Sequence, residues 1–153
     1  MPVPATQQVP ARRQWMAVLA RAKADEIAAL LAGAGALPAY DRIRGPESGL
    51  VMVRGRSGGS GAPFNLGEMT VSRCTVRTQT GQIGHAYVAG RDHCQAELAA
   101  LVDALLQHET YTATLHSCVI EPLAAAQRSQ HAAIQSKAEA TKVQFFAMRN
   151  MRA

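Results

Sequence analysis

Residues 68–89 have the sequence EMTVSRCTVRTQTGQIGHAYVA, and this stretch decides the fold. Its first part, Glu68–Thr78, is rich in β-branched residues, which favour strands, and Ile83–Ala89 continues the pattern. Residues 79–82 between them are polar and include a glycine, as is typical of a turn. We therefore expect an antiparallel hairpin. Because side chains alternate along a strand, Arg73 and Arg77 share one of its faces.

The residues upstream predict another strand, which enters a glycine-rich loop. Gly49–Arg56 has the sequence GLVMVRGR and leads into Ser57–Gly61. Alternation places Arg54 and Arg56 on one face of this strand. Small loop residues expose backbone N–H groups that can surround an anion, and the flanking guanidinium groups add positive charge. The loop lacks the lysine of a P-loop, so a hairpin loop whose arginines face water is the simpler interpretation.

The remainder of the chain has helical periodicity. Apolar residues recur three and four positions apart over residues 11–32 and over residues 94–108. A final long helix is expected over residues 122–148, because a proline suits the first turn of a helix. Residues 110–120 are expected to form a short extended or irregular link.

These elements predict an α+β fold. It combines a small, mostly antiparallel sheet with an N-terminal helical segment, a central helix and a long C-terminal helix. Residues 1–10 are expected to be a flexible N-terminal tail, and residues 11–153 a single domain.

The composition indicates a thin core. Of 153 residues 48% are hydrophobic, but 29 are alanines, and Leu, Ile, Val and Phe together number only 31. This is close to the limit at which a chain buries enough surface to offset its ordering entropy. We therefore expect the protein to complete its core against a partner. The candidate subunit interface is Trp15 together with the end of the alanine-lined C-terminal helix, Phe145, Phe146 and Met148.

Positive charge is concentrated in the middle of the chain. The net charge is +5, and residues 42–91 alone hold seven arginines, no lysine and two acidic residues. The planar fork of arginine suits bidentate contacts with phosphate or carboxylate. The pattern predicts an anionic ligand or an arginine-rich subunit interface. The candidate residues are Arg54, Arg56, Gly58, Gly59, Gly61, Arg73, Arg77 and Arg91.

Other classes of function have less support. No run of 18 or more apolar residues exists, so no transmembrane helix is expected. Three cysteines without a CxxC pair favour reduced thiols in the cytoplasm. The cysteines and five histidines lack a repeated ligand spacing, and no nucleophile is paired with a base, so we predict neither a metal site nor catalytic residues. The pI of 9.6 suggests nucleic-acid binding, but only Tyr87 lies among the strands as a stacking residue.

Several segments together resemble a known family. They are Arg13–Ala20, Ser48–Gly61 with Phe64 and Gly67, Thr70–Arg77, Tyr87–Asp92, Ala99–Gln107 and Ala140–Met148. In combination they are similar to the PhnG family, whose members are one of the components of the bacterial carbon–phosphorus lyase core complex, although no segment is diagnostic alone. The likeness covers roughly residues 12–150.

The resemblance implies a role in the degradation of alkylphosphonates. Members of this family assemble with subunits H, I and J, and they are required with subunits H, I and L for the first committed step. In that step methylphosphonate, or a similar alkylphosphonate, displaces adenine from ATP at the ribose C1 and gives α-D-ribose 1-methylphosphonate 5-triphosphate. The I subunit is regarded as the chemical centre, and the later cleavage of the C–P bond belongs to the J subunit with its iron–sulfur cluster. ATP is thus expected as a substrate of the complex, with no cofactor on this chain.

Three hypotheses follow from the sequence. The first is an accessory subunit that binds the I subunit and supports the complex. The second is a subunit whose arginines and glycines hold the phosphates of ATP or the phosphonate. The third is a module that acts alone and binds anions or nucleic acid, for which steeply salt-dependent binding would be expected.

Overall fold

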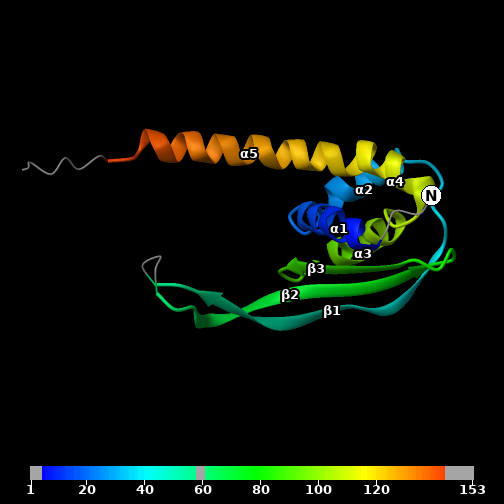
Figure 1. Cartoon of the computed structure of the whole chain (residues 1–153), viewed down its shortest axis with the longest axis horizontal. Helices are drawn as coiled ribbons and strands as arrows, with labels where there is room; N and C mark the ends of the chain where they lie inside the picture. Colours follow the sequence, from blue (N-terminus) through cyan, green and yellow to red (C-terminus); the bar gives the residue numbers. More distant parts are fainter. Residues whose placement is uncertain (1–4, 58–60, 144–153) are drawn as a thin grey trace, which may run out of the picture.

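A computed structural model describes residues 5–57 and 61–143 of the chain, with side chains described from residue 9 onward. Three antiparallel strands form one sheet in the order β1-β2-β3. All helices lie on one face of this sheet, and the opposite face has no helix over it (Figure 1). The α+β fold expected from the sequence is confirmed.

The bounds of the elements are as follows. The strands are β1 (Tyr40–Gly55), β2 (Phe64–Thr78) and β3 (Ile83–Ala89). The helices are α1 (Ala5–Leu19), α2 (Ala24–Ala32), α3 (His93–Leu105), α4 (Glu109–Leu115), the π-helical turn η1 (His116–Ile120) and α5 (Glu121–Ala140).

Both ends of the chain differ from the expected bounds. α1 begins at Ala5, so it takes in Pro10 and residues that were assigned to the N-terminal tail. α5 ends at Ala140 rather than at residue 148, and Thr141 follows it as the C-cap. The last residues expected in this helix, 144–148, lie outside the described residues.

The predicted link over residues 110–120 is wrong, because this segment is helical throughout. The His108 side chain accepts a hydrogen bond from the Thr110 backbone N–H and caps α4, and Leu115, Val119 and Ile120 are buried in the core. The β-branched residues here disfavour a helix only weakly, so burial of this apolar face decides the outcome.

β1 is longer than its sequence suggests. It begins at Tyr40, although Gly45 and Pro46 resemble a turn in the sequence. The strand accommodates these residues through irregularities in its register with β2, which lie between Arg42 and Arg44 and between Arg44 and Glu47. A bulge interrupts the alternation of side chains without ending the strand, so the sequence pattern was lost there.

The core lies between α3 and the inner face of the sheet. Val76, Val88, Val102 and Leu105 are fully buried there, and Leu19 joins them from α1. Trp15, which was expected at a subunit interface, is also part of this core and is only 7% exposed. Its indole N–H donates to the carboxylate of Asp103 on α3 at 2.9 Å, so the structure gives Trp15 an internal partner.

A polar cluster ties β1 to α3. The Tyr40 hydroxyl and the Arg42 guanidinium donate to the same carboxylate oxygen of Glu97, at 2.8 Å and 2.7 Å. Burial alone would raise the pKa of Glu97, but the hydrogen bonds from Arg42 and Tyr40 outweigh it and lower that pKa. Burial, together with the bond to Glu97, raises the pKa of Tyr40 to about 12.

Glu97→Gln is therefore expected to lower stability in a pH-dependent way. The pKa of Glu97 is lower in the folded than in the unfolded state, so its contribution is present at neutral pH and is lost as the pH falls through the folded pKa. Because Arg42 is largely exposed, we expect a loss of about 1 kcal/mol at pH 7, or about 2–4 °C in Tm. Thermal unfolding of both proteins should show this gap closing below about pH 4.

Glu68→Gln is the matched control for that series. Glu68 is an exposed carboxylate on β2 with no hydrogen bond within residues 61–143 or to residues 5–57. Its replacement should leave Tm unchanged across the same pH range. A gap between Glu97→Gln and the unaltered protein that stayed constant down to pH 3 would contradict the electrostatic role of Glu97.

Candidate functional site

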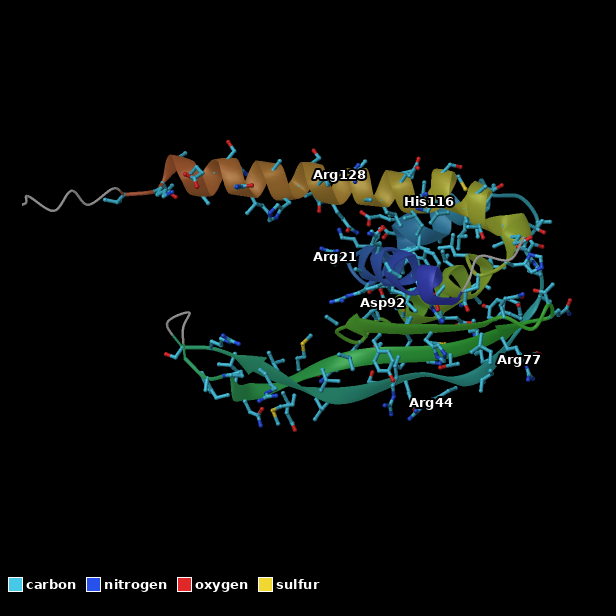
Figure 2. All side chains as sticks on the ribbon, viewed as in Figure 1. Arg21, Arg44, Arg77, Asp92, His116 and Arg128 are labelled. Atoms are coloured by element: carbon cyan, nitrogen blue, oxygen red, sulfur yellow. The ribbon has the colours of Figure 1, made fainter. Side chains whose placement is uncertain are left out.

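The uncovered face of the sheet carries a group of charged side chains. The carboxylate of Glu47 on β1 accepts hydrogen bonds from Arg44 at 2.6 Å and from Arg73 on β2 at 2.8 Å. The bonds from Arg44 and then Arg73 lower the pKa of Glu47. Figure 2 shows Arg44 on the side of the sheet away from the helices. Arg73, predicted to bind an anion, is thus already held by a carboxylate of its own chain.

The other candidate arginines are spread over the length of the sheet. Arg54 pairs with Asn65 near the far end of β1, and Arg56 directly follows that strand. Arg77 lies towards the other end of β2, opposite Asp41, and Arg91 follows β3. All four side chains are exposed.

One anion cannot contact all of these arginines. Asn65 and Arg77 are twelve positions apart on β2, which corresponds to roughly 40 Å at 3.4 Å per residue. Of the loop glycines, Gly58 and Gly59 lie outside the described residues, and Gly61 is half-buried. Anion binding by Arg54 and Arg56, or by Arg73, Arg77 and Arg91, therefore stays a prediction for separate places on the sheet.

The most prominent feature is a two-stranded extension of the sheet. β3 pairs only with Val71–Arg77, so β1 and β2 continue beyond it without a third strand or a covering helix (Figure 1). We call residues 50–57 and 61–70 the hairpin arm. Its exposed large apolar side chains are Leu50, Val51, Met52, Phe64, Leu66 and Met69, with Leu50 64% and Leu66 60% exposed.

The hairpin arm has the character of an interface. An isolated two-stranded ribbon is only marginally stable in water, and contiguous exposed apolar side chains mark contact surfaces. Sequence reasoning predicted the strands but did not recognise the arm. The signal was present in Leu50–Val53, since a continuous apolar run is typical of a strand that is covered on both faces.

α5 forms a second projection. Leu123 is its one buried residue within the described part of the chain, and its far half carries Ile134 at 66% exposure. Near its start, α5 and α1 enclose an open groove of about 420 Å³ that Arg21, Arg128 and His131 line (Figure 2). Gln127 joins the two helices, donating to the Val18 carbonyl at 2.9 Å. Phe145, Phe146 and Met148, predicted as interface residues, lie outside the described residues.

Groups capable of catalysis are sparse in the described residues. Burial raises the pKa of the Cys74 thiol, which disfavours a nucleophilic thiolate. Ser48 Oγ lies 2.8 Å from His93 Nε2, but no carboxylate within residues 5–57 and 61–143 accepts from the other ring nitrogen. Within those same ranges, no three His, Cys, Asp or Glu side chains gather where they could hold a metal ion.

The described helices were also compared with the length and apolarity that a bilayer requires. None of those within residues 5–57 and 61–143 combines a sufficient length with sufficient hydropathy to cross a membrane.

Comparisons with known proteins agree with the resemblance inferred from the sequence. The chain matches the family model described as phosphonate metabolism protein PhnG over residues 10–150. It is 45% identical over 140 residues to the alpha-D-ribose 1-methylphosphonate 5-triphosphate synthase subunit PhnG of Rhizobium meliloti (strain 1021). That match covers 90% of this chain and 87% of the relative. With a family match over nearly its whole length and a relative of this identity, the chain belongs to the PhnG family of phosphonate metabolism proteins.

Proposed function

We propose that this protein is a cytoplasmic, accessory subunit of an alpha-D-ribose 1-methylphosphonate 5-triphosphate synthase. The relative from Rhizobium meliloti is named as a subunit of such an enzyme. In the proposed reaction methylphosphonate attacks the ribose C1 of ATP, the bond to adenine breaks, and adenine leaves. ATP is then a substrate of the complex rather than a cofactor of this chain.

The hairpin arm is the observation that supports a subunit role. Its six large apolar side chains are exposed in the isolated chain, and covering them against another protein would remove that cost. We propose subunits H, I and J as physical partners, the I subunit as the one that carries the chemistry, and the L subunit as a functional requirement. This chain then contributes by supporting the arrangement of the I subunit.

The alternative is an anion- or nucleic-acid-binding module that acts alone. The distribution of the arginines gives it little support, because Arg73 is engaged by Glu47 and the remaining candidates are far apart. A single-stranded nucleic-acid site combines a continuous basic groove with aromatic platforms. On the uncovered face Tyr87 is the sole aromatic residue of β3.

Serine substitutions in the hairpin arm test the proposal. The double variant Leu50→Ser, Met52→Ser is to be co-expressed, with an affinity tag, together with subunits H, I and J. Burying a Leu or Met side chain contributes about 1.5–3 kcal/mol, so we expect the affinity for the partners to fall at least about tenfold. Exposed positions cost little in the isolated chain, so its thermal unfolding should be unchanged.

Ile43→Ser is the matched control for the arm. Ile43 is a large, exposed apolar residue on the same strand, but it lies outside the arm. This variant should assemble like the unaltered protein. Equal recovery of the partners with the double variant would contradict the role of the arm. Failure of the unaltered protein to recover any of these subunits would contradict the subunit assignment itself.

A further inference from the structure

β3 is an edge strand whose backbone groups can be assigned to two sides. The backbone N–H of His85 donates to Asp103 at 2.9 Å, and the carbonyl of Ile83 accepts from Gln107 at 2.8 Å, so both point away from β2. In an antiparallel strand the N–H and C=O of one residue point to the same side and alternate along the chain. The outward groups of β3 therefore belong to Ile83, His85, Tyr87 and Ala89.

Part of this edge has no hydrogen-bond partner. Gln107 and Arg12 satisfy the carbonyl of Ile83, and Asp103 satisfies the N–H of His85. Among the described residues, no donor or acceptor meets the carbonyl of His85, either backbone group of Tyr87 or the N–H of Ala89. These four groups form a row of acceptors and donors with the spacing that another strand would need.

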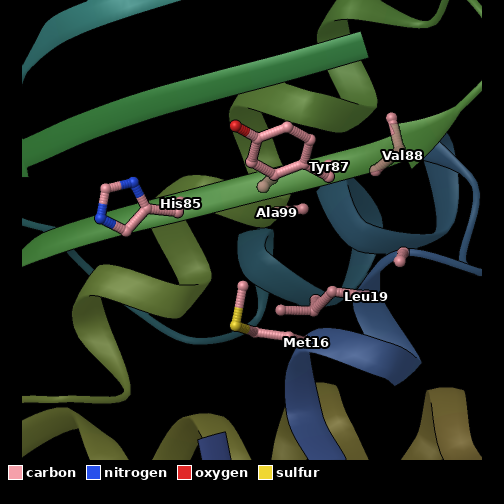
Figure 3. Close-up of a pocket in the computed structure, with 8 residues that line it drawn as sticks. Met16, Leu19, His85, Tyr87, Val88 and Ala99 are labelled. Carbon is pink, nitrogen blue, oxygen red and sulfur yellow. The ribbon is translucent and has the colours of Figure 1, made fainter. Parts of the chain in front are cut away.

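A small apolar pocket lies beside the unpaired groups. Met16 and Leu19 of α1, Ala99 of α3 and the β3 residues around Tyr87 enclose about 70 Å³ (Figure 3). An apolar cavity of about 150 Å³ accepts benzene, so roughly half that volume suits the three or four carbons of a valine or leucine side chain. The pocket thus lies where a side chain of an added strand could enter.

The opposite edge of the sheet is less suited to pairing. β1 has register irregularities beside Arg44 and between Val53 and Arg54, and Pro46 has no N–H to donate. Bulges and proline are features that protect natural edge strands from pairing. β3 pairs with β2 over seven consecutive residues without irregularity.

A positive charge flanks the pocket. Arg13 lies three positions before Met16 on α1, a spacing that places both on the same side of the helix. It is exposed and forms no ion pair within the described ranges. An acidic side chain near the end of an added strand would be attracted to it.

From these features we infer that β3 receives an extended segment of a partner subunit as a fourth strand. The segment carries a small aliphatic side chain that enters the pocket between α1 and β3, and an acidic residue that lies near Arg13. Main-chain hydrogen bonds to His85, Tyr87 and Ala89 provide affinity, and the pocket provides specificity. The inference rests on the proposed subunit role, but it concerns a surface distinct from the hairpin arm.

Hydrogen exchange resolved to single amides tests the inference in the assembled complex. The amides of Tyr87 and Ala89 should exchange fast in the free chain and at least about 100-fold more slowly in the complex with subunits H, I and J. The amides of Ala86 and Val88, which face β2, should be slow in both and serve as internal controls. A complex in which the Tyr87 and Ala89 amides still exchange fast would overturn the inference and leave the subunit role intact.

Two further outcomes would also overturn it. If no complex forms, the subunit role fails, and this inference fails with it. If the amides of Tyr87 and Ala89 become protected in the chain alone as its concentration rises, the occupant is a second copy of this chain rather than a partner subunit.

A matched pair of variants isolates the backbone contribution. Tyr87→Pro removes the outward N–H, which an edge strand tolerates because the bonds to β2 come from its neighbours. Tyr87→Thr removes the same aromatic ring but keeps the N–H. We expect Tyr87→Pro to weaken assembly about tenfold relative to Tyr87→Thr, while both free chains unfold at similar temperatures. Equal assembly of the two variants would contradict a backbone contact at this residue.

Discussion

Asp103→Ala is expected to destabilise the protein by about 3–5 kcal/mol, the cost of removing one partner of a buried ion pair. For a chain of this size that corresponds to a fall in Tm of about 6–20 °C. Thermal unfolding followed by circular dichroism measures the effect directly. This is the largest loss of stability that we expect from a single substitution in the described structure.

The reason is the number of donors that meet at one fully buried carboxylate. Arg12 donates to both oxygens of Asp103, at 3.1 Å and 2.7 Å, and the Trp15 indole donates at 2.9 Å. The backbone N–H of His85 completes the set at 2.9 Å. Asp103 itself is 0% exposed, so water cannot replace it when it is lost. Alanine would leave an indole, an amide and a guanidinium without their acceptor.

Asp41→Ala is the control for this prediction. Asp41 lies on β1, is exposed and accepts no hydrogen bond within the described ranges. Its replacement should change stability by no more than about 0.5 kcal/mol. A similar small effect of Asp103→Ala would mean that Arg12, Trp15 and His85 find other partners, and it would contradict the central role of this carboxylate.

Gly84→Ala is expected to cost about 3 kcal/mol or more, because α3 lies directly against β3 at this position. A Cβ at Gly84 would lie 2.8 Å from the Cβ of Ala104, and closer still to the carbonyl oxygen of Ala100 and the nitrogen of Ala104. All three atoms belong to the helix backbone or are bonded directly to it. Relief therefore requires a shift of α3 away from the sheet and a loss of packing throughout the core.

Gly67→Ala is the matched substitution in the same sheet. A Cβ at Gly67 meets nothing within 4 Å, so alanine there should be neutral or slightly stabilising. Chemical denaturation of both variants gives the comparison. If Gly84→Ala and Gly67→Ala had equal free energies of unfolding, the close approach of α3 to β3 would be refuted.

The local part of the fold was predictable. Ile83–Ala89 alternates between buried and exposed residues over its whole length, so its bounds follow from the sequence alone. The central helix also has an apolar stripe and an N-cap at Asp92, whose side chain accepts from the Gln95 N–H. The errors lie where that local signal is weak or broken, as at Pro46 in β1 and over residues 110–120.

The candidate site was predictable only in part. The arginines and the apolar run of β1 are visible in the sequence, but their surroundings are not. Glu47 binds Arg73 across 26 positions, and Trp15 reaches Asp103 across 88. No periodicity connects residues so far apart, which is why Trp15 was assigned to an interface although it belongs to the core.

The sequence by itself therefore determined the class of the fold, the order of the strands along the chain and, through the resemblance, the family. Only the tertiary structure decided which apolar residues remain uncovered, which arginines are already paired and which edge of the sheet has unpaired backbone groups. The physical reason is that periodicity and turn chemistry act between neighbours in the chain. Exposure and pairing depend instead on which distant elements pack together, and β1 and β2 extend past every helix that could have covered them.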